Sequence, residues 1–375
     1  MSSAVHKIDR PFLILVTVLT VIGFIVFLSA SLGLLTRGGS SFAMVATKQG
    51  ISVILGIIAF LVFSKIPYTW LRKSAFFILL GAIIINLLLF IPSLTFHFNG
   101  ASRWLDLGYL TFQPSELLKI AFIIYLSAWI YSMKDKIEKF KFGLLPYIVI
   151  VGILSILLLN QRDTDTLVVI ASTGLLMLFV AGIRFRHIIL VVILMGIMLG
   201  GVILIRPYAL DRVKTFLNRG SDTQGSGYQI NQSLIAIGSG QLIGRGFGQS
   251  VQKFGYLPQP TDDSIFAVTA EEFGFVGSSL LVILYLLLIA SIFRIGNRAP
   301  DIFAGVMVIG IGVLIIVQSF MNISAMLGLI PLSGMPLLFV SHGGTSIIIT
   351  LLTMGIVANV SRHMKGLSRS YSQDL

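Results

Sequence analysis

Long stretches without a charged residue dominate this chain, and they predict membrane-spanning helices. Crossing the hydrocarbon of a bilayer takes ~20 residues, so the last uncharged run, 302–361, is too long for one span. Pro331 and Pro336, together with Gly328 and Gly334, divide that run in two. We therefore predict an all-α, polytopic protein of about ten transmembrane helices, with the other spans in 11–36, 49–64, 74–102, 120–133, 142–161, 166–183, 187–205 and 273–293.

Composition supports the membrane interpretation. Of the 375 residues, 56% are hydrophobic and only 11% are charged, whereas a soluble domain carries roughly a quarter charged residues. The segment 120–133 is short for a span and needs Glu116 and Lys119 drawn into its first turns. Cysteine is absent, which excludes disulfides, thiolate metal sites and thiol nucleophiles.

The distribution of Lys and Arg predicts the orientation. An even number of spans puts both termini on one side, and a cytoplasmic N-terminus leaves most short-loop cations in the cytoplasm, as the positive-inside rule requires. The Lys and Arg residues behind the net charge of +12 thus divide between the two sides of the membrane as expected of a membrane protein, and the charge does not indicate that the protein binds nucleic acid. The cytoplasmic set holds 16 of the 27 Lys and Arg: Lys7, Arg10, Lys65, Arg72, Lys73, Lys134, Lys136, Lys139, Lys141, Arg184, Arg186, Arg294, Arg298, Arg362, Lys365 and Arg369.

Outside the bilayer, sequence is concentrated in two external loops, about 93–115 and 206–265. The second is a large loop between the seventh and eighth helices, and it carries Arg206, Arg212, Lys214 and Arg219 among its charges. We expect this loop to be a functional surface of a single integral membrane domain spanning 1–375.

The first polar cluster lies at the fourth span. Arg103 and Trp104 precede it, and Glu116 and Lys119 lie three residues apart on one face of its first turns. Pro114 suits the first helical position, where its missing N–H is not needed. Glu116 and Lys119 are either a self-satisfied ion pair or a charged wall for an anionic headgroup.

Two further polar segments leave alternatives open. Asp163 and Asp165 lie within a short external loop, 161–166, where they could bind a metal ion or pair with Arg162. The glycine run 238–248 lacks the Gly-Lys-Ser/Thr ending of a nucleotide-binding loop. Its glycines either allow tight turns and close packing or capture an anion with backbone N–H groups.

Asp262 and Asp263 stand where the long loop re-enters the membrane, with Glu271 and Glu272 two turns deeper. Loss of hydration at a poorly hydrated entrance to the bundle raises the pKa of a carboxyl group, and a raised pKa suits the group to accept a hydroxyl proton. The alternative is an ordinary solvated cap at a helix N-terminus.

A broken segment opens the last span, with Asn322 before it and Pro331, Pro336 and His342 within it. Irregular backbone at membrane depth survives only where protein buries it or where it lines a wet cavity. The segment is thus either a structural kink or a cavity wall.

Four motifs, in order along nearly the whole chain, resemble the SEDS family of cell-wall polymerases, which includes FtsW, RodA and SpoVE. They are Asn-Gly-Ala-Ser-Arg-Trp with Phe-Gln-Pro-Ser-Glu-Leu-Leu-Lys (99–119), Gly-Tyr-Gln with Gln-Ser-Leu-Ile-Ala-Ile-Gly-Ser-Gly (227–240), Gln-Lys-Phe-Gly-Tyr-Leu-Pro through Glu-Glu-Phe-Gly-Phe-Val-Gly (252–277), and Pro-Leu-Ser-Gly-Met-Pro through Ser-His-Gly-Gly-Thr-Ser (331–346). Gln252-Lys253 and Asp-Ser-Ile-Phe look more like FtsW or SpoVE than RodA.

The resemblance implies roles for particular residues. Asp263 corresponds to the family's essential external aspartate, and Asp163 to an aspartate of its Gln/Glu-Pro-Asp-Leu-Gly-Thr motif. This chain departs from that motif with Arg162 and Asp165, and from the final motif with His342 and Thr345 in place of the usual tyrosine and serine. The candidate substrate-binding residues are Arg103, Glu116, Lys119, Arg212, Lys214, Lys253, Ser341 and His342, with Asp163, Asp262 and Gln232 as possible support.

The implied activity is a peptidoglycan glycosyltransferase that polymerises lipid II at the outer face of the bacterial cytoplasmic membrane. Asp263 would deprotonate the acceptor's 4-hydroxyl, and cations or a divalent ion (Mg²⁺ or Mn²⁺) would steady the departing pyrophosphate without any nucleotide. The implied partners are a class B penicillin-binding protein transpeptidase (FtsI-like) and divisome membrane proteins. Alternatives are a lipid II flippase, a RodA-type elongation polymerase and a scaffold that only recruits a transpeptidase.

Overall fold

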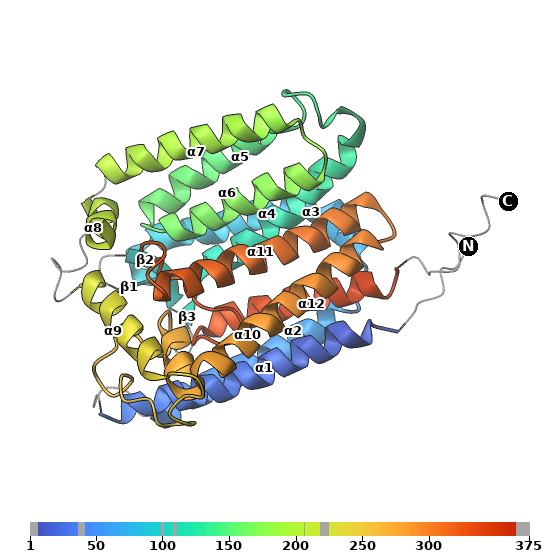
Figure 1. The fold of residues 1–375 in the computed structure, drawn as a ribbon. Coiled ribbons are helices and arrows are strands. Elements are labelled where there is room, and N and C mark those ends of the chain that lie inside the picture. The colour runs from blue at the N-terminus through green and yellow to red at the C-terminus, as the bar shows by residue number, and fades with distance from the viewer. Residues whose placement is uncertain are drawn as a thin grey trace.

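Apolar helices run side by side through the body of the molecule, which we describe from a computed structural model (Figure 1). The structure describes residues 7–36, 42–98, 101–106, 108, 111–205, 207–217 and 225–364. Asn99, Arg206, Arg219, Lys365 and Arg369, which the sequence singled out, lie outside the described residues.

Within these ranges, eight helices are long and apolar enough to cross a membrane, and two apolar helices are shorter. This agrees with the predicted count of about ten. The long helices are α1 (Arg10–Ser31), α2 (Phe42–Phe63), α3 (Tyr68–Leu87), α4 (Pro114–Ser132), α7 (Phe185–Ile205), α10 (Ile265–Asn297), α11 (Ile302–Met326) and α12 (Gly344–Ser361), and the shorter ones are α5 (Leu144–Asn160) and α6 (Thr164–Val180).

Aspartates and prolines mark where several of these helices begin. Asp9, Asp163 and Asp301 precede α1, α6 and α11, and each side chain accepts a hydrogen bond from a backbone N–H in the first turn. Pro114 occupies the first position of α4, as predicted. These residues satisfy or remove N–H groups that would otherwise lack a partner at a helix end.

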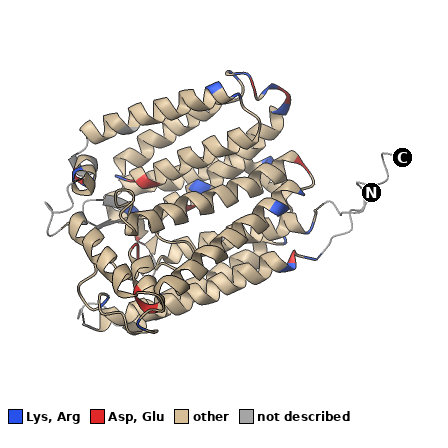
Figure 2. Cartoon of the chain, in the orientation of Figure 1, with Lys and Arg blue, Asp and Glu red and all other residues tan. Residues whose placement is uncertain are grey.

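The first and last helices meet at one end of the molecule. The backbone N–H of Asp9 donates to Ser361 Oγ at 3.3 Å, and Asp9 pairs with Arg294 at 2.7 Å. An even number of crossings brings the start of α1 and the end of α12 together, so this contact agrees with the predicted topology. In Figure 2 most charged residues gather toward the ends of the helices.

The opposite end is built differently from the prediction. The helix expected in 74–102 ends at Leu87 and gives way to short 3-10 turns, η2 (Leu88–Phe90) and η3 (Pro92–Leu94), and a small antiparallel sheet. Its strands are β1 (Thr95–Phe98), β2 (Ala101–Asp106) and β3 (Thr111–Phe112), in the order β1-β2-β3. The apolar stretch 74–102 continues past the helix because the strands carry apolar residues too.

The large external loop also contains helices that the sequence did not predict, α8 (Pro207–Leu217) and α9 (Ser226–Ser239). The helix that follows, α10, starts eight residues before the predicted span 273–293 and bends at Gly274, which has φ 65° and ψ −164°. The predicted broken segment is observed, since residues 327–343 form no helix between α11 and α12.

Burial divides the bundle into an interior and a periphery. In the most apolar 18-residue stretch of each helix, 78% of α11 and 83% of α12 is buried, whereas only 12% of α7 is buried. α11 packs against α4, α6 and α10, and α12 packs against α2. The interior helices therefore hold the broken segment in place between them.

Candidate active site

A cavity of about 590 Å³ opens at the end of the bundle that carries the sheet, α8 and α9. Its walls come from β2, β3, the turn before α6, α8, α9, the end of the long loop and the broken segment. The lining residues are Arg103, Trp104, Thr111, Gln113, Arg162, Asp163, Arg212, Gln229, Gln259, Asp262, Asp263, Leu332, Gly334, Met335, Pro336, His342, Gly343, Gly344, Thr345 and Ser346. The structure thus brings segments far apart in the sequence to one site.

Asp262 and Asp263 line this cavity immediately before α10. Asp263 is only 6% exposed, and its Oδ1 has no hydrogen-bond partner among the described residues. Burial raises the pKa of Asp263 to about 6, against a hydrogen bond from Gln229 that lowers it. Burial, together with the neighbouring charge of Asp263, raises the pKa of Asp262 to about 7. The pair is therefore poised to exchange a proton near neutral pH.

The backbone around these two carboxylates is held by side chains of other elements. Asn322 Nδ2, from α11, donates to the Asp263 carbonyl at 2.8 Å and to the Met335 carbonyl at 2.7 Å. Ser341 Oγ donates to the Asp262 carbonyl at 2.6 Å. Ser341 and Asn322 therefore tie the aspartates to the broken segment. Ser341, which was predicted to bind substrate, holds the backbone of Asp262 instead and does not line the cavity.

Two guanidinium groups line the same cavity as Asp262 and Asp263, and the charge of Arg212 opposes the rise in the pKa of Asp263 that burial causes. Arg103 lies 3.9 Å from Asp163 and 4.0 Å from Asp165, and its guanidinium also donates to the Arg162 carbonyl. Arg212 pairs with Asp165 at 3.0 Å. Both arginines remain on the cavity wall, so the site offers positive charge to an anionic group.

The carboxylates of the 161–166 loop do not fit the metal alternative. Asp165 is occupied by Arg212 and Arg103, while Asp163 accepts from the backbone N–H and the hydroxyl of Thr166 at the start of α6. In the part of the chain that the structure describes, no three His, Cys, Asp or Glu side chains come together as a metal site. The two aspartates are paired with arginines, but the partners are Arg103 and Arg212 and not the predicted Arg162.

His342 and Thr345 also line the cavity. The His342 ring stacks on Phe27 with the ring centroids 5.4 Å apart, and its Nδ1 has no partner among the described residues. Burial and the charge of Lys48 lower the pKa of His342 to about 4, so the imidazole is neutral at pH 7. Thr345 Oγ1 donates to the Thr111 carbonyl at 3.1 Å.

Several residues predicted to bind substrate lie away from this cavity. Lys119 is 1% exposed and donates to Glu116 at 2.8 Å and to Gln318 at 2.6 Å, inside the bundle. This is the self-satisfied ion pair of the two alternatives. Lys214 is exposed on α8, and Gln232 is half-buried on α9; neither lines the cavity.

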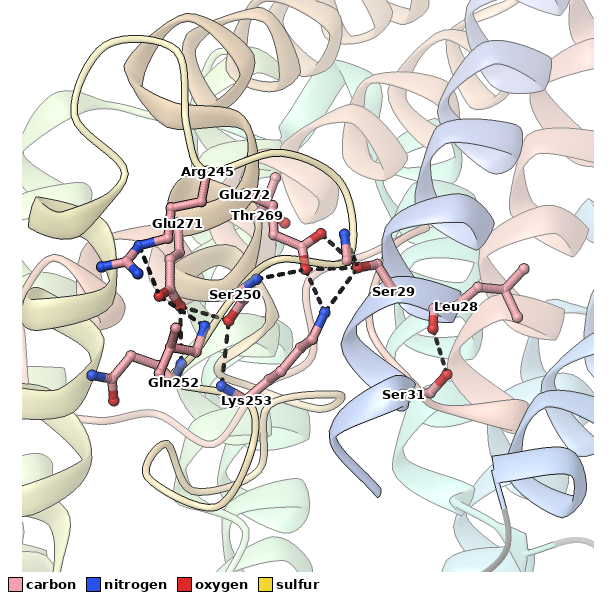
Figure 3. A network of polar contacts seen from close by, with 12 residues as sticks. Leu28, Ser29, Ser31, Arg245, Ser250, Gln252, Lys253, Thr269, Glu271 and Glu272 are labelled. Carbon is pink, nitrogen blue, oxygen red and sulfur yellow. Dashed lines mark hydrogen bonds and ion pairs between the residues drawn. The ribbon is translucent and has the colours of Figure 1, made fainter. Parts of the chain in front are cut away.

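Lys253 belongs to a separate network, shown in Figure 3, in which it is fully buried and lies 2.6 Å from Glu272. It does not line the cavity, so the structure does not place it beside a substrate pyrophosphate. The sequence could not show this, because its spacing gives no sign of which carboxylate a loop lysine meets.

The structure adds cavity residues that the prediction had not selected, above all Gln229 and Gln259. Gln229 Nε2 donates to Ser264 Oγ at 2.9 Å, beside Asp263. The sequence did carry a signal for Gln229, because it belongs to the Gly-Tyr-Gln motif (227–229) that the sequence shares with the family.

Comparisons with known proteins match this arrangement. Residues 9–366 match the family of cell cycle proteins FtsW, RodA and SpoVE. The chain is 37% identical over 365 residues, 96% of each chain, to the "Probable peptidoglycan glycosyltransferase FtsW" of Geobacter metallireducens. It is 35% identical to "Stage V sporulation protein E" of Bacillus subtilis, over 95% of this chain and 98% of the relative.

Solved structures share the fold. A chain from work on the "Structural coordination of polymerization and crosslinking by a peptidoglycan synthase complex" superposes with a TM-score of 0.78 at 23% identity, covering 95% of this chain and 98% of that one. The "Rod shape determining protein RodA" of Thermus thermophilus gives a TM-score of 0.67 at 22% identity, covering 96% and 98%. These matches confirm the resemblance seen in the sequence, and the chain belongs to the FtsW, RodA and SpoVE family of cell cycle proteins.

Proposed function

We propose that this protein is a peptidoglycan glycosyltransferase that polymerises lipid II into glycan strands. The observation that carries this proposal is the cavity that Asp262 and Asp263, both with raised pKa, line together with Arg103 and Arg212. A base that titrates near neutral pH beside fixed cations suits the transfer of a sugar from a diphosphate leaving group. The names of the relatives support the same reaction class.

In this reaction Asp263 accepts the proton of the acceptor's 4-hydroxyl through its unpartnered Oδ1. The oxygen attacks the anomeric carbon of the donor, the bond from that carbon to the diphosphate oxygen breaks, and undecaprenyl diphosphate leaves with both bonding electrons. Attack from the face opposite the leaving group inverts the anomeric centre. Arg103 and Arg212 stabilise the negative charge that develops on the diphosphate.

His342, Asp262 and Gln229 contribute binding and tuning in this proposal. The neutral imidazole of His342 offers a hydrogen bond to a sugar hydroxyl, and Gln229 orients Asp263. The charge of Asp263 raises the pKa of Asp262, so Asp262 holds a proton more readily while Asp263 is ionised. The predicted divalent cation stays a prediction, and no step above uses it.

The orientation follows from the basic residues. The turns beside the meeting point of α1 and α12 carry the cations that the positive-inside rule assigns to the cytoplasm, so both termini are cytoplasmic. The cavity, with the loops about 93–115 and 206–265, then faces outward, where lipid II is polymerised. A class B penicillin-binding protein transpeptidase is the proposed partner, with division as the cellular role, given the FtsW and SpoVE relatives.

The test is in vitro polymerisation of labelled lipid II by the purified protein in detergent, alone and with a co-purified transpeptidase. Detergent abolishes sidedness, so glycan product cannot come from a flippase. Glycan chains resolved on a gel are the expected result. Translocation of lipid II across vesicles without any glycan product in either assay would overturn the proposal.

A further inference from the structure

A second cluster of charged side chains lies outside the cavity, where α1, the long loop and α10 meet (Figure 3). Lys253 Nζ lies 2.6 Å from Glu272 Oε1 and 3.2 Å from Ser29 Oγ. Lys253 is 0% exposed and Glu272 is 1% exposed. Charges this deeply buried persist only when they are paired and hydrogen-bonded, and this pair is.

Glu271, beside Glu272, binds the backbone of the loop. Its carboxylate accepts from the N–H groups of Val251 at 3.0 Å and Gln252 at 3.3 Å, and from Ser250 Oγ. Arg245 reaches the same carboxylate at 3.4 Å. The two glutamates therefore hold successive residues of the loop against the start of α10.

Backbone contacts reinforce this attachment. Arg245 N–H donates to the Glu271 carbonyl at 3.0 Å, and Gly246 N–H donates to the Glu272 carbonyl at 2.9 Å. Gly244 has φ +80°, and a Cβ there would collide with the Glu272 carbonyl. The glycine run thus serves tight turns and close packing, the first of the two alternatives from the sequence.

Both partners of the ion pair are connected to Asp263 by short, hydrogen-bonded stretches of chain. After Lys253, the N–H of Leu257 donates to the Gln252 carbonyl at 2.8 Å, and those of Asp262 and Ser264 donate to the Gln259 carbonyl at 3.1 and 3.3 Å. On the other side, α10 runs from Ile265 directly to Glu272. The pair therefore closes a loop of chain whose tip carries the aspartates.

We propose that Lys253 and Glu272 are positioning residues, whose buried pairing holds the loop so that Asp263 stays at its place in the cavity. This inference rests on the proposed function for its activity readout. Lys253 acts through the chain to Asp263 and not on the substrate, because it is fully buried and absent from the cavity wall.

The experiment compares Lys253→Met, Glu272→Gln, the double variant, and Lys253→Arg in lipid II polymerisation. Each single change leaves one buried charge without its partner, and misplacement of a base by about 1 Å costs about 100-fold in rate. We expect kcat to fall about 10- to 100-fold in each single variant, with KM within about 2-fold. The neutral double variant has no stranded buried charge but also no ion pair, so we expect only partial recovery, with activity still below that of the wild type. Lys253→Arg keeps the charge and retains more activity than Lys253→Met, and Lys65→Met, an exposed lysine at the opposite end, serves as the matched control.

Hydrogen exchange of the amides in 257–264, followed by mass spectrometry, gives a readout that does not need activity. We expect faster exchange in this segment in both single variants, intermediate rates in the double variant and wild-type rates in Lys65→Met. A double variant that exchanges and reacts like the wild type would show that the loop keeps its place without the ion pair, and it would overturn the positioning role. A Lys253→Met effect confined to KM would overturn it as well. Wild-type protein without polymerase activity would instead overturn the proposed function, while the exchange rates still decide the positioning role.

Discussion

Two pairs of adjacent carboxylates, Asp262-Asp263 and Glu271-Glu272, lie nine residues apart in the sequence, and they differ in the hydrogen-bond and charge partners that surround them. The glutamates are surrounded by Lys253, hydroxyls and backbone N–H groups. The aspartates face a cavity, and Asp263 Oδ1 has no partner among the described residues. Satisfied carboxylates hold a structure together, whereas a buried carboxylate with one oxygen left without a donor keeps its affinity for a proton. Chemistry is therefore expected at the aspartate pair.

The sharpest way to break this comparison is Asp263→Asn. An amide cannot accept the hydroxyl proton, and general-base catalysis contributes about 10²- to 10⁴-fold, so we expect a loss of activity of that size. Burial outweighs the hydrogen bonds and the charge of Arg212 and raises the pKa of Asp263, so removing its charge should leave thermal stability in detergent equal or higher. Full polymerase activity in this variant would discard Asp263 as the base.

Lys119→Met probes a second satisfied carboxylate, Glu116. Removal of one partner from a buried ion pair costs about 3–5 kcal/mol, because the remaining charge stays buried. We expect a large drop in the unfolding temperature, and substantial recovery in the Lys119→Met, Glu116→Gln double variant. Thermal unfolding in detergent measures both; an unchanged unfolding temperature together with a raised KM would instead support a substrate role for the pair.

Arg212→Gln tests the cavity cations. Because Arg212 is partly exposed and already paired with Asp165, we expect a moderate effect, about 10-fold in KM, and a weaker dependence of KM on salt. Lys214→Gln, two residues along α8 and exposed, is the matched control. If both variants change KM equally, the effect belongs to the general charge of α8.

The smallest expected effect is in the pH profile. Catalysis needs ionised Asp263, so activity should rise with pH between about 5 and 8, and Asp262→Asn should leave a single acid limb near pH 6. Stability changes in the opposite direction. The folded-state pKa values lie above the unfolded value of 3.8, so the folded chain binds more protons and loses stability as pH rises from about 4 to about 7. Denaturant unfolding at several pH values checks the predicted loss of stability. Activity measured over the same pH range checks the catalytic prediction, and a flat activity profile would contradict it.

Hydropathy was enough to predict the membrane-spanning helices, because crossing a membrane demands long apolar segments. Their even number predicted that the start of α1 and the end of α12 lie at the same end of the molecule. The sequence pattern also predicted the Pro114 helix start and the broken segment after Asn322. The aspartate pair emerged from burial arguments and from the resemblance together. Hydropathy could not reveal the small sheet in 95–112, since short apolar strands and helices look alike at that length.

The partners of buried cations were the main limit of sequence reasoning. Lys119 and Lys253 stand in motifs that look functional, yet each meets a carboxylate inside the protein, Glu116 and Glu272. The spacing of Glu116 and Lys119 allowed their pairing as one of two alternatives, but it could not decide between them. The pairing of Lys253 with Glu272 depends on how the long loop packs against α1 and α10, and a linear pattern carries no record of that packing.

The seam between α1 and α10 has a consequence for biosynthesis. Helix α1 leaves the ribosome first, yet Ser29 finds Glu272, and Asp9 finds Arg294 and Ser361, only after most of the chain has been made. Until then its polar groups wait in lipid or beside temporary neighbours. These contacts of α1 can therefore form only after α10 and α12 have been made, and nascent chains halted before α10 should leave α1 open to extraction or capture by insertion factors.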